Sequence, residues 1–241
     1  MVFNEFKLNQ DKTELLVIHS SYCSCPSLFC PRVGDIDVAP VKAASNLGVV
    51  FDDTMSFKSH ISDVCKSSFY HLRNISRIRK YLTRENTEMA VHAFDTSKLD
   101  YYDSQLYGLH RFPIAKLQSV QNSAARLVCT TRKFDHISPT LIDLHWLPTT
   151  HHIVFKILLL VYKSLNDKAP LYLSELLTYR RSSYSLQSVS NGDLVEPSSK
   201  LRTYGDRSFA VCAPTLWNSL PLSIRRSSSV DFLKSFENLS F

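Results

Sequence analysis

Apolar residues recur every three or four positions through much of the chain, and this spacing predicts α-helices. The pattern is clearest over residues 113–128, where polar residues such as Lys116 and Arg126 fall off an apolar stripe. Pro113 suits the first turn of such a helix, where the missing N–H costs no hydrogen bond. The stripe consists of Ile114, Leu117, Val120, Ala124 and Leu127.

The segment upstream, from Leu99 to Tyr107, is rich in aromatic residues and stops at Gly108. Glycine is a common helix stop, so we expect this segment and the one after it to form a helix pair. Capping residues and apolar spacing predict further helices elsewhere. These are expected over residues 55–82, from Thr83 to Phe94, from Ser138 to about Trp146, from Thr149 or Thr150 to Leu165, from Ala169 to Leu177, over 209–220 and after Ser229.

The first 53 residues differ, because short apolar runs alternate there with turn-like residues. Leu15–Ile18 and Asn46–Phe51 have the length of strands, and residues 33–38 suggest one more. The fold class expected is therefore α+β, with a small N-terminal β element, a predominantly helical domain and a small C-terminal tail. Residues 179–199 read as a linker or as a hairpin turning at Asn191-Gly192.

Several long blocks in a fixed order carry a family resemblance. They read LDYYDSQLYGL, LQSVQNSAARLV, HISPTLIDLHWLP, FKILLLVYKSLNDKAPLYLSELL and TYGDRSFAVCAPTLWNSLP. This series resembles the region after the catalytic palm in reverse transcriptases of non-LTR retrotransposons, of the jockey-like LINE lineage. The resemblance implies the end of a palm over residues 1–53, a helical thumb-like domain over 54–178, a linker or hairpin over 179–199, and a C-terminal helical tail over 200–241.

The resemblance also assigns roles near the N-terminus. Residues 7–14 resemble motif D, which implies that Lys12 lies near the triphosphate as a general acid; without the resemblance this is an ordinary β-hairpin. Residues 46–51 resemble motif E, the primer grip, which implies that primer contacts involve Leu47, Gly48 and Val49.

Asp52 and Asp53 imitate the aspartate pair that holds the catalytic metals in reverse transcriptases. In the family that pair precedes motif D, whereas here it follows the motif D-like segment. We therefore assign one of these aspartates to the start of the next helix, where a carboxylate stabilises free N–H groups. The catalytic pair is expected to lie before Met1 and so to be absent.

Positive charge concentrates in the centre of the chain. The net charge is +6, yet residues 54–133 alone hold thirteen Lys or Arg against six Asp or Glu, a surplus of +7. Such a surplus favours phosphate contacts, although a solvated helix face is the simpler interpretation. With the resemblance, we expect RNA or DNA primer–template to be bound by Lys66, Arg73, Arg77, Arg79 and Lys80.

Other function classes lack their motifs. The five glycines are widely spaced, which excludes a P-loop and a dinucleotide fingerprint. No nucleophile elbow or protease motif indicates a hydrolase. The longest apolar run, residues 153–162, is about half of a bilayer span, so no membrane contact is expected.

Metal-binding patterns are also missing. The spacing of Cys23, Cys25 and Cys30 does not match paired CxxC sites, and we expect free thiols in a reducing compartment. Four histidines, His136, His145, His151 and His152, form no HxxxH or HExxH pattern, so core, capping or surface roles are expected rather than a metal.

The sequence thus predicts the C-terminal part of an RNA-directed DNA polymerase that positions primer–template, inactive alone without its catalytic aspartates. No cofactor is expected in this chain, and Mg²⁺ only in the full-length enzyme, whose palm and fingers would be its partners. An intracellular location, nucleus or cytoplasm, follows. The alternatives are a non-catalytic nucleic-acid- or protein-binding helical module, or a decayed element remnant, since Asp95 stands where the family pattern has an apolar residue.

Overall fold

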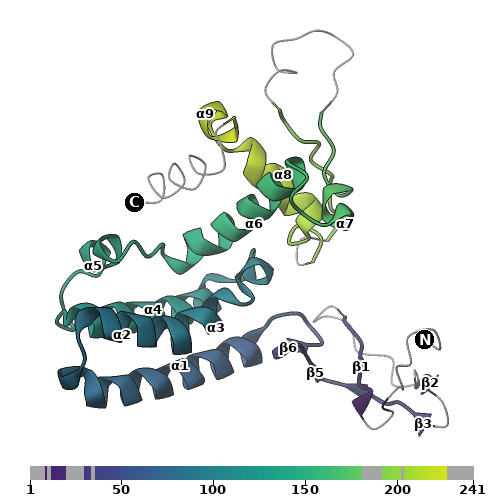
Figure 1. Cartoon of the computed structure of the whole chain (residues 1–241). Coiled ribbons are helices and arrows are strands. Elements are labelled where there is room, and N and C mark those ends of the chain that lie inside the picture. Colours follow the sequence, from purple (N-terminus) through teal and green to yellow (C-terminus); the bar gives the residue numbers. More distant parts are fainter. Residues whose placement is uncertain are drawn as a thin grey trace. The chain divides into compact units, whose positions relative to one another are not determined.

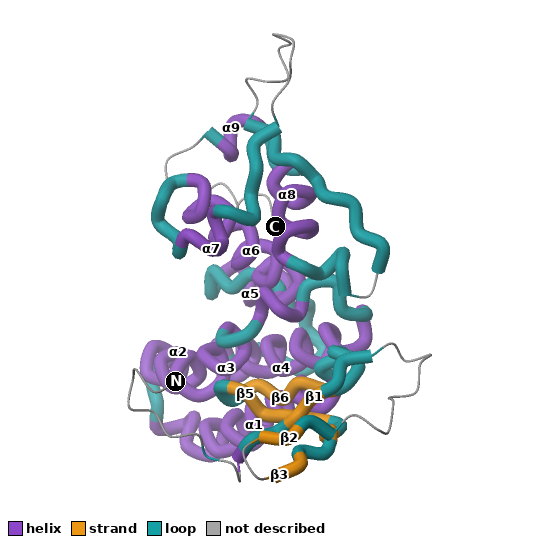
Figure 2. Tube along the Cα trace, turned by 90° about the vertical axis from the view of Figure 1, so that its right-hand side faces the viewer, coloured by secondary structure: helices purple, strands orange, loops and turns teal. Residues whose placement is uncertain are grey.

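The computed structural model describes residues 9, 12–19, 30–33, 36–180, 192–201 and 204–226, without the side chains of residues 33, 36, 95 and 96. Short strands come first and helices follow, which confirms the α+β prediction (Figures 1 and 2). The chain divides into two compact units, Met1–Asp63 and Val64–Phe241. The cysteines at 23 and 25 and the helix expected after Ser229 lie outside the described residues.

The strands of the first unit pair two by two. The pair β1–β4 is parallel, whereas β2–β3 and β5–β6 are antiparallel. Two-stranded pairs are marginal by themselves in water, and these strands are only two to four residues long. Their bounds are β1 (Leu15–Leu16), β2 (Arg32–Val33), β3 (Ile36–Asp37), β4 (Pro40–Val41), β5 (Ala43–Asn46) and β6 (Val49–Asp52).

The hairpin β5–β6 corrects the prediction of one continuous strand over residues 46–51. Asn46 pairs with Val49, so Leu47 and Gly48 form a two-residue turn between the strands. Both turn residues have positive φ, 50° and 81°, as tight hairpin turns require. Leu47 is 81% exposed, whereas Val49 is fully buried. The apolar pattern does not reveal the turn, because a hairpin apex exposes its side chains whatever their polarity.

Helices form the second unit, into which α1 continues from the first. Two predicted boundaries are confirmed. Thr83 caps α2 by accepting a hydrogen bond from the N–H of Asn86 at 3.2 Å, and α6 begins at Thr149, one of the two starts expected. The bounds are α1 (Lys58–Ile78), η3 (Arg79–Tyr81), α2 (Arg84–Val91), the π-helical turn η4 (His92–Thr96), α3 (Ser97–Asp100), η5 (Asp103–Leu106), α4 (Arg111–Cys129), α5 (Ser138–Asp143), α6 (Thr149–Leu165), α7 (Leu171–Ser174), α8 (Phe209–Asn218) and α9 (Leu222–Arg225).

The predicted helix pair around residues 97–128 is half correct. Its second member exists as α4, and four of its five stripe residues are buried. The first member is broken into α3 and the 3₁₀ helix η5, so the expected continuous helix up to Gly108 is wrong. Gly108 does end the segment with φ of 69°. The break lets Asp103 point inward, where it is 3% exposed.

One hydrophobic core joins α6 to the C-terminal helices. Its buried side chains include Ile157 and Val161 of α6, Trp217 of α8, and Leu194 from the segment before α8. The described part of the tail, residues 200–201 and 204–226, therefore packs with α6 and has no separate core. The ends of the 179–199 segment pair as a hairpin would, through Tyr179 and Leu194.

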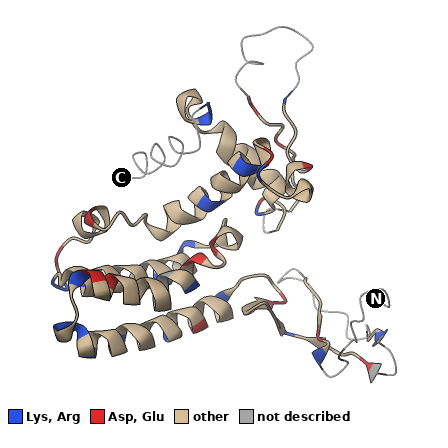
Figure 3. Cartoon of the chain, viewed as in Figure 1, with Lys and Arg blue, Asp and Glu red and all other residues tan. Residues whose placement is uncertain are grey.

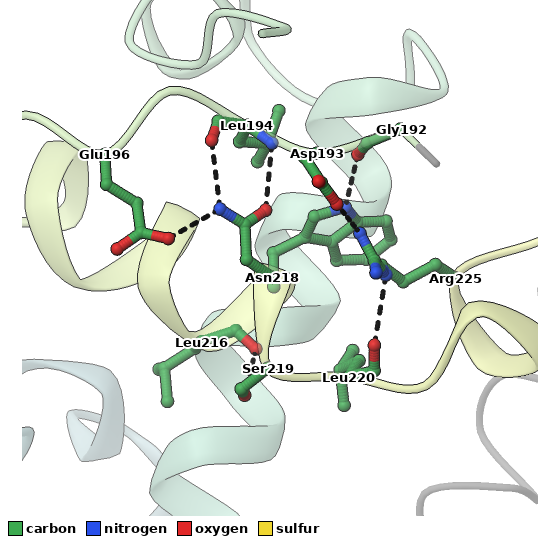
Figure 4. A network of polar contacts seen from close by, with 10 residues as sticks. Gly192, Asp193, Leu194, Glu196, Leu216, Asn218, Ser219, Leu220 and Arg225 are labelled. Carbon is green, nitrogen blue, oxygen red and sulfur yellow. Dashed lines mark hydrogen bonds and ion pairs between the residues drawn. The ribbon is translucent and has the colours of Figure 1, made fainter. Parts of the chain in front are cut away.

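Polar contacts hold the arm at residues 192–196 against α8 and α9 (Figure 4). The Asn218 side chain accepts a hydrogen bond from the N–H of Leu194 and donates one to its carbonyl, both at 2.9 Å. Asp193 accepts a bond of 2.5 Å from Arg225, and Trp217 donates to the Gly192 carbonyl at 3.3 Å. Gly192 thus belongs to this arm, and Asn191, the other half of the predicted turn, lies outside the described residues.

Two blocks of the family pattern that lie about a hundred residues apart also contact each other. Arg207, from the block TYGDRSF, donates to the carbonyls of Tyr107 and Gln105 at 3.0 and 3.2 Å. A Cβ on Gly108 would lie 2.7 Å from the Arg207 side chain, so glycine is needed there for space as well as for its positive φ. The contact joins the segment before α4 to the start of α8. Among the described residues, no helix combines the length and apolar character of a membrane span.

Candidate functional site

The motif D-like lysine lies in the first unit. Lys12 is exposed and its N–H donates to the carbonyl of Asn9 at 3.3 Å. Just after it, Glu14 accepts a hydrogen bond from the N–H of Ser45 in β5 at 3.3 Å. The segment of Lys12 is therefore tied to the hairpin that carries the primer-grip-like residues. Of those residues, Leu47 and Gly48 form the exposed apex, and Val49 is buried beneath it.

The Asp52 carboxylate organises the loop between β6 and α1. Its Oδ1 accepts hydrogen bonds from the N–H groups of Thr54 and Ser56 at 3.1 and 2.8 Å, and both hydroxyls also donate to the carboxylate. Burial raises the pKa of Asp52, but these hydrogen bonds outweigh it and leave the pKa below its ordinary value. The Asp53 carboxylate is oriented differently, and its Oδ2 lies 3.6 Å from Nε2 of His19. One of the two aspartates was expected to bind free N–H groups at the start of the next helix. Asp52 does accept such hydrogen bonds, but from the loop before α1, which begins at Lys58.

A stripe of basic side chains follows the exposed face of α1 within the second unit. Lys66, Arg73 and Arg77 are exposed and lie seven and four residues apart, which places them on one face of the helix. Lys80 continues the series in η3. At 1.5 Å per residue this basic stripe extends about 20 Å. Figure 3 shows Lys and Arg at both ends of α1.

Aromatic rings lie within the basic stripe. Tyr70 is 62% exposed and falls between Lys66 and Arg73 on the same face. Tyr81 is 77% exposed, with the Lys80 ammonium 4.7 Å from its ring centroid. The only acidic residue of the sequence between 54 and 84 is Asp63. The surface therefore combines positive charge with exposed rings, the two features that bind phosphates and stack on bases.

Arg79 differs from the other four predicted contacts. Its guanidinium donates to the carbonyls of Leu127 and Val128 at the C-terminal end of α4, and to that of Leu82, each at 2.9 Å. The last carbonyls of a helix have no partner within the helix, so this side chain stabilises the end of α4. We therefore leave Arg79 out of the proposed nucleic-acid contacts. Counting charge along the sequence could not separate it from its neighbours.

A cavity of about 270 Å³ in the second unit was not expected from the sequence. Residues of α3, η5 and α6 line it, together with aromatic and histidine side chains from elsewhere in the unit. Its polar group is formed by Asp100, Asp103 and His152, whose potential ligand atoms all lie within 4.8 Å of one another. His152 Nδ1 lies 2.6 Å from Asp103 Oδ2 and 3.4 Å from Asp100 Oδ1.

Asp103 is the unusual member of this group. It is 3% exposed, and its Oδ1 has no hydrogen-bond partner among the described residues. Burial raises the pKa of Asp103, an effect that the hydrogen bond and the charge of His152 only partly oppose. Asp103 thus lines the cavity with one carboxylate oxygen, Oδ1, that is buried and has no hydrogen-bond partner among the described residues. No sequence motif indicated this, because Asp103 and His152 are 49 residues apart.

The four described cysteines, Cys30, Cys65, Cys129 and Cys212, are free, as expected. Cys65 and Cys212 are buried, and burial raises the pKa of Cys212 to about 11. A thiol with such a pKa is almost entirely protonated at neutral pH. Cys212 therefore acts as a core residue and not as a nucleophile.

Comparison with known proteins gives no relative for this chain. It matches no protein-family model, no curated protein and no solved structure. The candidate sites therefore rest on their own geometry.

Proposed function

We propose that this chain positions primer–template nucleic acid as the C-terminal part of a non-LTR retrotransposon reverse transcriptase, with the basic stripe of α1 as its grip. The single observation that carries the proposal is the exposed basic and aromatic face that runs along α1 into η3. It consists of Lys66, Arg73, Arg77 and Lys80 together with Tyr70 and Tyr81.

The chemistry of this face suits a backbone contact. Phosphates repeat along each strand of a duplex, and Lys and Arg along one helix face can neutralise several of them in a row. Such contacts hold a duplex in place without reading its sequence. A polymerase needs this property to retain whatever template it copies.

The short strand pairs of the first unit support the same proposal. Their two to four residues are less than an independent sheet needs, as expected for strands that belong to a larger palm sheet. Phosphoryl transfer needs metal ions held by carboxylates, and the oxygens of Asp52 accept hydrogen bonds from its own loop. We propose that the chain binds nucleic acid and that catalysis requires the remaining palm and fingers, with Mg²⁺ in the complete enzyme.

The salt dependence of binding tests the grip. Replacing Arg73, Arg77 and Lys80 with Gln removes three positive charges and retains residues that favour helices. The affinity falls as salt rises, and each lost phosphate contact makes the slope of log K against log salt less steep by about 0.9. We therefore expect the magnitude of the slope to decrease by about 2 to 3. Fluorescence anisotropy with an RNA–DNA primer–template duplex, measured over a range of salt concentrations, gives this slope.

A matched control separates local contacts from net charge. Lys168, Arg180 and Lys200 are also exposed but lie outside the stripe, and their Gln substitution removes the same charge. We expect this control to keep nearly the full slope. Equal slopes for the two triple variants would show that α1 has no special part in binding.

A further inference from the structure

The cavity at the N-terminal end of α6 has the features of an ion site. We propose that it binds one divalent transition-metal ion, of the zinc class, through carboxylate oxygens of Asp100 and Asp103 and a ring nitrogen of His152. The site is separate from the basic stripe, and the inference is independent of the proposed function.

Convergence of the three side chains is the first support. Asp100 ends α3, Asp103 begins η5, and His152 lies in the first turn of α6. Segments some fifty residues apart thus place one nitrogen and two carboxylate donors within 4.8 Å of one another. Zinc in proteins takes this mixture of histidine nitrogen and carboxylate oxygen at about 2.0–2.2 Å.

The unpartnered oxygen of Asp103 is the second and independent support. Asp103 is 97% buried and lines the cavity, yet its Oδ1 has no hydrogen-bond partner among the described residues. A buried carboxylate oxygen without a partner is costly, and native proteins rarely leave one. A cation in the cavity would satisfy this oxygen directly.

The charge at the site also suits a divalent ion. Two carboxylates converge on a single imidazole. Lys156 is the nearby positive charge, and its effect on the pKa of Asp103 is smaller than those of burial, His152 and Asp100. With neutral His152 the two carboxylates carry two negative charges, which a divalent cation balances. On binding, the metal replaces the hydrogen on His152 Nδ1, and the neutral imidazole then carries its single proton on Nε2, so that no proton is lost from the ring.

Little rearrangement is needed to close the site. Ligand atoms around a tetrahedral zinc lie about 3.3 Å apart. The ligand atoms lie within 4.8 Å of one another, so no separation must shrink by more than about 1.5 Å, and the 2.6 Å between His152 Nδ1 and Asp103 Oδ2 must widen by about 0.7 Å if both atoms bind the ion. Asp100 can supply this movement, since its side chain is 37% exposed, whereas Asp103 and His152 are more confined. Three protein ligands leave a coordination position toward the cavity for water. The ion would join η5 to α6.

Zinc titration of the full chain, stripped of metal with a chelator, tests the site. Isothermal titration calorimetry should show one equivalent of bound Zn²⁺. Since loss of an outer partner already costs 10–100-fold in metal affinity, loss of a ligand should cost about 100-fold or more. We expect this loss for D103N and H152Q, and also for D100N, whose partly exposed position tolerates substitution. A control, D135N/H136Q, changes an exposed Asp and His away from the cavity and should bind zinc as the wild type does.

Cobalt distinguishes this site from the cysteines. Co²⁺ bound by oxygen and nitrogen gives only weak visible bands, whereas Cys23, Cys25 or Cys30 would add an intense thiolate-to-cobalt band in the near ultraviolet. We expect the weak bands, and their loss in D100N. Zinc affinity that is unchanged in all three site variants, or cobalt that appears only with the thiolate band, would overturn the proposal.

Discussion

Replacing Leu194 with Ala is expected to lower the free energy of unfolding of the second unit by about 2–5 kcal/mol. Leu194 is fully buried in the core that α6 shares with α8, although it lies in a segment without regular structure. Its backbone is held on both sides by Asn218, so the chain cannot easily move to fill the space that the smaller side chain leaves. The cost therefore contains a cavity contribution as well as lost burial.

Urea unfolding followed by tryptophan fluorescence measures this effect, because both tryptophans, Trp146 and Trp217, lie in the second unit. Val195→Ala is the matched control, since Val195 is the next residue and is 41% exposed. The control should change stability by less than about 0.5 kcal/mol, as surface substitutions do. A Leu194→Ala variant as stable as the control would mean that the arm at residues 192–196 does not share the core of α6.

Replacing Arg79 with Met is expected to cost about 2–4 kcal/mol of stability and to leave the salt slope of nucleic-acid binding unchanged. The substitution keeps an apolar stem but removes hydrogen bonds from a charged group to three backbone carbonyls, and such bonds contribute about 1.5–3 kcal/mol apiece at most. Two of those carbonyls end α4, where no other backbone donor replaces the guanidinium.

The matched control for Arg79 is Arg77→Met, which changes the same residue type two positions earlier. Arg77 is exposed in the last turn of α1, so its loss should lower the salt slope by about 0.9 and barely change stability. The two arginines should thus show opposite effects in the two measurements. An Arg79→Met variant of full stability, with a reduced slope, would return Arg79 to the nucleic-acid contacts.

Local patterns in the sequence predicted the parts of the fold that local forces determine. The α4 stripe has helical spacing with Pro113 in its first turn, and Thr83 caps α2 through a neighbour three residues away. Both features depend on residues within one or two turns. For that reason a single sequence was enough to predict them.

The failures of sequence reasoning share a dependence on distant partners. The aromatic segment before Gly108 was expected to be one helix, but Asp103 leaves the helical path to meet His152 from another helix. Arg79 was grouped with its basic neighbours because its partners at the end of α4 lie 48 and 49 residues away. Leu47 seemed to continue a strand, yet the pairing of β5 with β6 places it at the turn.

Photo-cross-linking at the basic stripe tests the nucleic-acid proposal most directly. A benzophenone amino acid replaces Tyr70 in one variant and Tyr172, which is 66% exposed on α7, in another. Each full-length variant is irradiated with an RNA–DNA primer–template duplex. The proposal predicts efficient cross-links from position 70 that high salt abolishes, and few from position 172. Equal cross-linking from both positions, or none from position 70 under conditions where the duplex is bound, would contradict it.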